Sequence, residues 1–119
     1  MDSVTSSLKG KVAVVTGGSG AIGHAIMNTL IQSGASATSL DISEASDKRN
    51  WMKCDLRDAA SVSAVVQSVY QKKRRVDLVI HAAGISHDAV VWKMSVEDWD
   101  CVQAVNLRGA LLLLRQAVR

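Results

Sequence analysis

The sequence predicts an α/β fold in which parallel strands alternate with helices around one sheet. Two observations support this prediction. Short apolar, β-branched runs such as Val12–Val15 recur along the chain, and longer segments follow whose apolar residues return at helical spacing. Strands that alternate with helices in this way imply a parallel sheet with right-handed crossovers.

Length and composition predict one domain over residues 1–119, with a polar lead-in over residues 1–9. The 48% hydrophobic and 21% charged residues are typical of a globular chain rather than a disordered one. No apolar run reaches the roughly 20 residues of a membrane span, and no secretory signal is visible. Cys54 and Cys101 lack close spacing, so we expect a cytoplasmic protein without a disulfide or zinc site.

The first strand is predicted over residues 11–16, where an apolar run is bounded by polar residues and glycine. A helix is predicted from about Ala21 to Ser33, because apolar residues recur on one face. Gly34 is a typical C-terminal stop for that helix.

The next elements are strands predicted over residues 37–41 and 51–54, joined by a polar loop. A helix is predicted from Asp58 to about Lys73. Its apolar face is formed by four valines: Val62, Val65, Val66 and Val69.

A fourth strand is predicted over residues 76–81, apolar throughout as expected when both faces are covered. After a loop over 84–94, Ser95 and the acids that follow it resemble a capping box, and the final helix is predicted from there to the chain end. Strands in the spatial order 3-2-1-4 form the N-terminal part of a doubly wound, Rossmann-type sheet. Its ligand crevice lies at the carboxyl ends of strands one and four.

A glycine-rich loop, residues 16–23, joins the first strand to its helix. Glycines let the backbone turn tightly and a pyrophosphate come close, and the helix N-terminus attracts the negative charge. A plain tight turn is the alternative, but the flanking strand and helix favour nucleotide binding. No Gly-Lys-Ser/Thr closes the loop, so it is not a P-loop. The predicted phosphate-binding residues are Gly17, Ser19, Gly20, Ala21, Ile22 and Gly23.

Asp41 ends the second strand at the separation from the glycines expected of an acid that binds a ribose 2′-hydroxyl. Ile42 after it is predicted to contact the cofactor too. A carboxylate here repels a 2′-phosphate, so the sequence favours NAD over NADP. The alternative is a solvated turn residue, and Arg49 is the arginine that a loop would have to bring back for NADP.

Asp55 ends the third strand and Leu56 follows it, and a carboxylate and a backbone N–H at this place suit the edge of adenine. The alternative, nearly as strong, is that Asp55 caps the helix near Asp58. The fourth strand ends in small residues that leave room for the ribose and nicotinamide: Ala82, Ala83 and Gly84.

Three other features lie outside these motifs. His81 is a poor candidate for a catalytic acid or base, because a strand-end histidine is usually held by local hydrogen bonds; no histidine shows metal-ligand spacing. The run Lys72–Arg75 is interpreted as the cationic end of a helix rather than a nucleic-acid site, since no aromatic platform or second basic patch accompanies it.

Asn106, a mediocre helix former, either holds a water or backbone group or faces solvent, and the sequence leaves both open.

Taken together, these residues resemble the short-chain dehydrogenase/reductase family. The resemblance runs in order through residues 16–23, Asp41, 54–56, 81–84 and 106–109. Residues 84–88 and 97–100 look like the 3-oxoacyl-(acyl-carrier-protein) reductase branch. Two departures are Ala21, where glycine is common, and His81-Ala82, where Asn-Asn is usual.

The resemblance implies hydride transfer between NAD and a secondary alcohol or ketone, including acyl thioester substrates. Val105 would line the nicotinamide side, and Asn106 would hold a water in a proton relay. The family's Ser, Tyr and Lys lie in a half that this sequence does not contain. Tyr70, followed four residues later by Arg74, does not match them, so the chain alone is expected to be inactive.

The resemblance also implies a homo-oligomer formed through the last helix, with the run Leu111–Leu114 as part of the interface. Two alternatives remain. One is a non-catalytic, truncated form that acts as a nucleotide-binding or dimerising module. The other is an extended, epimerase-like relative, since the glycine loop also fits that branch.

Overall fold

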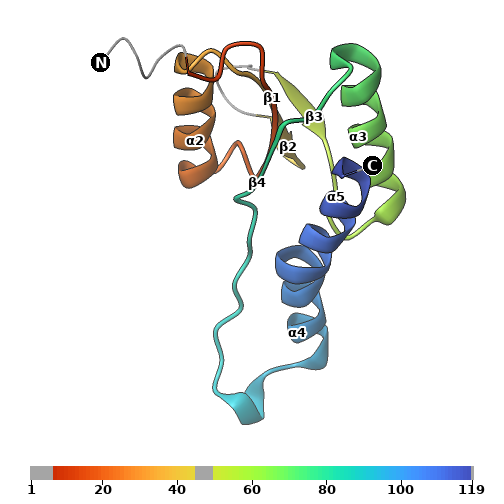
Figure 1. Cartoon of the computed structure of the whole chain (residues 1–119). Coiled ribbons are helices and arrows are strands. Elements are labelled where there is room, and N and C mark those ends of the chain that lie inside the picture. The colour runs from red at the N-terminus through yellow and green to blue at the C-terminus, as the bar shows by residue number, and fades with distance from the viewer. Residues whose placement is uncertain (1–6, 45–49, 119) are drawn as a thin grey trace.

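The computed structural model describes residues 7–44 and 50–118 and shows a four-stranded parallel sheet with helices on both faces (Figure 1). The spatial order β3-β2-β1-β4 confirms the predicted order. The strands are β1 (Val12–Thr16), β2 (Ser36–Asp41), β3 (Trp51–Lys53) and β4 (Leu78–His81).

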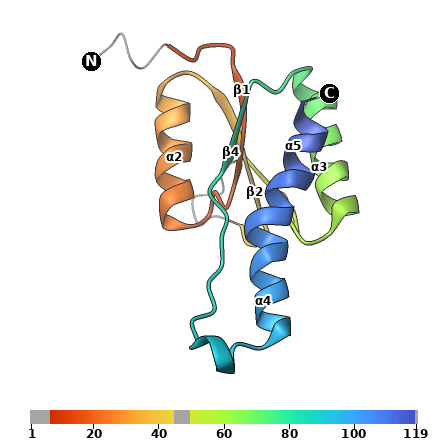
Figure 2. The same cartoon turned by 60° about the horizontal axis from the view of Figure 1, so that its bottom comes forward.

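The helices divide between the two faces of the sheet. Figure 2 shows α2 alone on one face, with α3 and α5 side by side on the other, while α4 projects beyond the end of the sheet. The helical segments are α2 (Ala21–Gln32), α3 (Ala59–Lys73), η1 (Val91–Lys93), α4 (Val96–Gln103), η2 (Ala104–Arg108) and α5 (Gly109–Ala117).

The predicted final helix is confirmed, but it contains a π-helical turn that the sequence did not predict. Ser95 is its N-cap, as the capping pattern indicated, and its hydroxyl accepts the Asp98 N–H at 3.0 Å. Through η2 the Gly109 N–H donates to the Ala104 carbonyl, five residues back. The helix therefore runs from Val96 to Ala117 with its register shifted in the middle.

The fourth strand differs most from its prediction. It begins at Leu78, because the Asp77 carboxylate instead accepts the Val12 N–H at 2.8 Å and the Arg75 guanidinium. Its four residues are half-buried rather than fully covered, since β4 lies at one edge of the sheet. The predicted lead-in also packs in part: Leu8 lies against the core on the α2 side, while residues 1–6 are outside the described residues.

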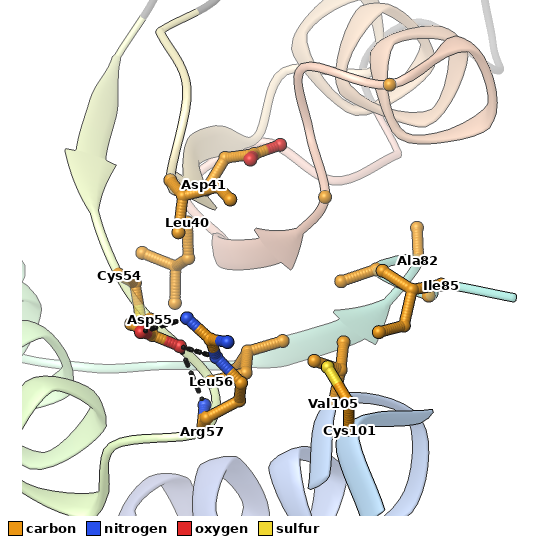
Figure 3. Close-up of a pocket in the computed structure, with 15 residues that line it drawn as sticks. Leu40, Asp41, Cys54, Asp55, Leu56, Arg57, Ala82, Ile85, Cys101 and Val105 are labelled. Atoms are coloured by element: carbon orange, nitrogen blue, oxygen red, sulfur yellow. Dashed lines mark hydrogen bonds and ion pairs between the residues drawn. The ribbon is translucent and has the colours of Figure 1, made fainter. Parts of the chain in front are cut away.

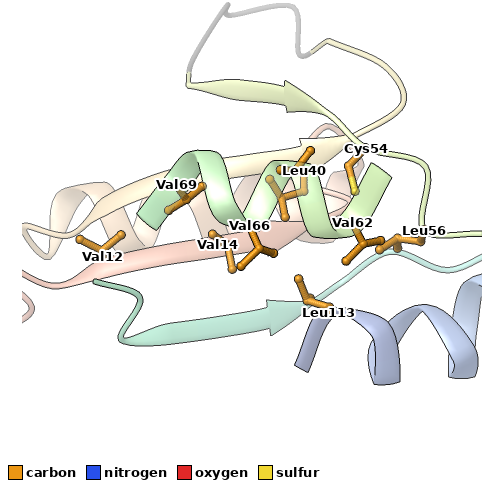
Figure 4. Packing of buried hydrophobic residues seen from close by; sticks show 10 residues of the cluster. Val12, Val14, Leu40, Cys54, Leu56, Val62, Val66, Val69 and Leu113 are labelled. Atoms are coloured by element: carbon orange, nitrogen blue, oxygen red, sulfur yellow. The ribbon is translucent and has the colours of Figure 1, made fainter. Parts of the chain in front are cut away.

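The core forms two layers because alternate residues of a strand point to opposite faces. Every residue of β1 is buried, as expected of a central strand. Val14 faces α3 and α5, where it packs with Val66 and Leu113 (Figure 4). Val15 faces α2 and packs with Met27.

The basic run lies where the structural interpretation put it, at the end of α3. Arg74 adopts the left-handed conformation (φ 69°) and its N–H closes the helix on the Tyr70 carbonyl. Arg75 pairs with Asp77 at 2.7 Å. The run thus ends the helix and anchors the next strand.

Leu113 should be a strong determinant of stability, because it is fully buried between α5 and the sheet. Leu113→Ala should lower the free energy of unfolding by about 2–5 kcal/mol, measured by urea denaturation. Ile31→Ala on α2 is the matched control: this side chain is 41% exposed and lies outside both core clusters, so the change should be within about 0.5 kcal/mol. Equal losses in the two variants would show that the α5 packing is wrong.

Candidate functional site

A cavity of about 340 Å³ opens at the carboxyl ends of the strands (Figure 3). The strand ends, the β3–α3 connection and the helix α4–η2 together form its wall. Ten residues predicted to bind a cofactor line it: Gly17, Gly20, Asp41, Ile42, Asp55, Leu56, Ala82, Ala83, Gly84 and Val105.

Contacts with the backbone require glycine at two positions of the turn from β1 into α2. Gly17 has φ +68°, and a Cβ on it would lie 2.7 Å from the Ala83 backbone. A Cβ on Gly23 would overlap the Gly17 carbonyl. The loop can therefore cross the end of β4 and enter the helix only without side chains at these two positions.

The N-terminus of α2 is not capped by a side chain of its own first turn. Its N-cap is Gly20, which has no side chain to cap the helix, and its first turn contains no acidic residue. The first N–H groups of a helix have no intrahelical acceptor and carry partial positive charge, so this end suits an anion. The other predicted loop residues, Ser19, Ala21, Ile22 and Gly23, lie at this turn beside the cavity rather than in its lining.

Asp41 is held against the glycine loop. Its carboxylate accepts the Ser19 N–H and the Ser43 N–H, both at 3.2 Å. The acid at the end of β2 therefore lies beside the start of α2, where the sequence predicted it. Ile42 is 61% exposed at the mouth of the cavity, and Arg49 lies outside the described residues.

Asp55 has a partner that the sequence analysis missed. Its carboxylate accepts from the backbone N, Nε and Nη2 of Arg57, each at 3.0 Å, and the side-chain hydrogen bond is the main reason that the pKa of Asp55 is lowered. The Arg57 guanidinium reaches into the cavity (Figure 3). The alternative that Asp55 caps α3 is wrong, because Asp58 caps it by accepting the Ala60 N–H.

Four more residues line the cavity without having been predicted. They are Leu40, Cys54, Ile85 and Cys101. Leu40 and Cys54 precede predicted acids at strand ends, and Ile85 follows the predicted Gly84, so strand-end position was a usable signal for these three. Cys101 reaches the cavity from α4, and no sequence signal placed it there.

The wall at the end of β4 is held from two sides by side chains that hydrogen-bond to its backbone. The Thr16 hydroxyl accepts the Ala83 N–H at 3.2 Å. From η2, the Asn106 amide accepts the Ile85 N–H and donates to the Ile85 carbonyl, both at 2.9 Å. Each of the two alternatives left open by the sequence is met in part: Asn106 is exposed, and its side chain holds a backbone segment.

Residues 11–119 match the family described as short chain dehydrogenase. The chain belongs to this family. Members of the short-chain dehydrogenase family are NAD(P)-dependent oxidoreductases, and the Rossmann-type fold described above is the fold of their cofactor-binding region.

Comparison with individual short-chain dehydrogenases shows how much of each relative's length this chain covers. The chain is 32% identical to D-threitol dehydrogenase of Mycolicibacterium smegmatis, over 89% of this chain and 45% of that protein. It is also 32% identical to 3-oxoacyl-[acyl-carrier-protein] reductase of Thermotoga maritima, over 93% and 50%. The ligand-free aldohexose dehydrogenase of Thermoplasma acidophilum superposes with a TM-score of 0.91 at 27% identity, over 95% of this chain and 45% of that one. The chain thus spans about half the length of the curated relatives it matches.

Tyr70 lies outside the cavity lining, on α3, where its hydroxyl donates to the Ala117 carbonyl at 2.6 Å. Among the described residues, no three His, Cys, Asp or Glu side chains gather in a group suited to a metal ion. No helix within the described ranges is long and apolar enough to cross a bilayer.

The two free cysteines should differ in reactivity. Burial is the main reason that the pKa of the Cys54 thiol is raised, and the residue is 2% exposed, whereas Cys101 is half-buried at the cavity wall. Because the thiolate reacts and must be reached, iodoacetamide at about pH 8 should alkylate Cys101 well before Cys54, as read by mass spectrometry. Cys101→Ser should remain unmodified under conditions that label Cys54→Ser once; labelling of both variants at one rate would contradict this assignment.

Proposed function

We propose that the cavity binds NAD and that the chain is the cofactor-binding part of a short-chain dehydrogenase. The observation that carries the proposal is the pairing of Asp41 with the Ser19 N–H beside the bare N-terminus of α2. That arrangement sets an acceptor for ribose hydroxyls next to a cradle for a pyrophosphate.

The remaining parts of the dinucleotide have complementary groups along the cavity. Leu56 has an N–H without a hydrogen-bond partner among the described residues, and the neighbouring Asp55 carboxylate is an acceptor. A donor and an acceptor side by side suit the ring nitrogen and the amino group of adenine. Ala82–Gly84 and Val105 would face the nicotinamide.

The charge balance of the adenosine end favours NAD over NADP. Arg57 is the cation in the lining, but Asp55 binds it through two nitrogens and offsets its charge. The Asp41 carboxylate has no ion-pair partner within 4.0 Å among the described residues. A 2′-phosphate beside Asp41 would meet the negative charge of this carboxylate.

The parent reaction is proposed to interconvert a secondary alcohol and a ketone, with a small alcohol, ketone or acyl thioester as substrate. Support comes from the relatives, which include D-threitol dehydrogenase and 3-oxoacyl-[acyl-carrier-protein] reductase. The nucleotide held by the glycine loop and Asp41 would supply the hydride acceptor, or in its reduced form the hydride donor, for this interconversion. In this chain Asn106 would position the wall beside the alcohol carbon by holding Ile85. The free cysteines support a cytoplasmic setting.

Asp41→Ala tests the cofactor assignment by calorimetric titration with NAD and NADP. Loss of hydrogen bonds to a charged acceptor should weaken NAD binding by about ten- to a hundredfold and remove the preference over NADP. Asp88→Ala, which deletes an exposed carboxylate outside the cavity lining, is the matched control and should bind both nucleotides like the wild type. If the wild-type chain binds NADP as tightly as NAD, the role given to Asp41 is wrong.

A second candidate function is that of a non-catalytic, dimerising module, and an exposed apolar stripe favours it. The stripe follows helical spacing along the α4–η2–α5 helix, with Leu107 at 68% and Leu111 at 56% exposure. The run Leu111–Leu114 contributes only in part, since Leu113 is core. The stripe comprises Val96, Trp99, Leu107, Leu111, Leu114 and Val118.

We expect the 119-residue chain to sediment as a dimer through this stripe and to consume no NADH with ketone or acyl-thioester substrates. Leu111→Glu should yield the monomer, because a carboxylate would be buried at the interface. Gln71→Glu, an exposed change on α3, should remain dimeric. A monomeric wild type would exclude the dimer, and measured turnover would exclude the non-catalytic function.

A further inference from the structure

His81, the last residue of β4, hydrogen-bonds through both ring nitrogens. Nδ1 lies 2.7 Å from the Thr16 hydroxyl, on β1. Nε2 lies 3.2 Å from the Asn106 carbonyl oxygen, in η2. The ring therefore connects the central strand to the π-helical turn, although it is not part of the cavity lining.

The partners of the ring determine where its proton lies. The Asn106 carbonyl can only accept, so Nε2 must carry the hydrogen. The Thr16 oxygen already accepts the Ala83 N–H, and its own hydrogen is then free to point at Nδ1. When His81 is neutral with its hydrogen on Nε2, the ring, the Thr16 hydroxyl, the Ala83 N–H and the Asn106 carbonyl all have hydrogen-bond partners.

A second proton on the ring would leave one group unsatisfied. Nδ1–H would have to donate to the Thr16 oxygen, and the Thr16 hydroxyl hydrogen would lose its acceptor. Thr16 is 0% exposed, so water does not replace that acceptor. No charged side chain within residues 7–44 and 50–118 is hydrogen-bonded to the ring; Arg108, on the same π-helical turn, donates to the Arg57 carbonyl instead.

The bonds of His81 complete a loop around the segment 82–85. Thr16 binds the start of this segment and Asn106 binds its end, and His81 joins Thr16 to Asn106. These hydrogen bonds therefore fix the distance between β1 and η2 at the place where segment 82–85 bridges the two elements.

We infer that His81 is a positioning residue: held as the neutral Nε2–H tautomer, it fixes segment 82–85 as the wall for the nicotinamide half of the cofactor. The inference rests on the proposed NAD site. It goes beyond that site because it assigns a role to a residue outside the cavity lining and predicts an effect on one half of the ligand alone.

The test compares NAD with ADP-ribose, which lacks the nicotinamide, by calorimetric titration of the full 119-residue chain. His81→Ala should weaken NAD binding by about two- to tenfold and leave ADP-ribose binding unchanged. His81→Asn places an acceptor near Nδ1 and His81→Gln places a donor near Nε2, so each should restore part of the NAD affinity.

Three outcomes would overturn the inference. Equal weakening of both ligands would show that His81 only stabilises the fold, and unchanged NAD binding in all three variants would show that it positions nothing. A wild-type chain that binds neither ligand would reject the proposed site itself, a result distinct from the other two.

Nitrogen-15 NMR of the wild-type ring tests the tautomer independently of any variant that fails to fold. The expected spectrum at neutral pH has a protonated Nε2 and an unprotonated Nδ1. A protonated Nδ1, in either the other tautomer or the imidazolium, would overturn the proposed bonding.

Discussion

The close approach of the glycine loop to the end of β4 is the constraint on which the site depends. Gly17 crosses the Ala83 backbone at a distance that no Cβ permits, and it does so in a left-handed conformation. After this crossing α2 begins within a few residues of β1, and its N-cap Gly20 lies in the cavity lining. The position of Asp41 follows, since its carboxylate is held by an N–H of the same loop.

Much of this arrangement is encoded locally and was therefore predictable from the sequence. Strand order follows from alternating patterns and the handedness of crossovers. The glycine loop and Asp41 follow from chemistry at adjacent strand ends, which a parallel sheet always brings to one edge. These features need no knowledge of side-chain packing, and the structure has them where they were expected.

The features that were missed depend on contacts between distant segments or on local register. Asn106 pairs with Ile85 across 21 residues, and helical periodicity does not encode such a partner. Cys101 reaches the cavity only because α4 continues past the sheet. Arg57 bonds to Asp55, two residues before it, and such a contact also occurs in ordinary turns. Its place in the cavity lining therefore follows only from the three-dimensional arrangement of the strand ends.

The central position of β1 has a consequence for how the chain acquires its structure. β1 pairs with both β2 and β4, and the Val12 N–H bonds to an acid 65 residues later in the chain. On the ribosome, β1 can pair with β2 soon after both emerge, but its other edge must wait until β4 has been synthesised. Such non-local pairing slows folding. Until then one side of the most buried strand stays open, so nascent chains should be most prone to aggregate in that interval.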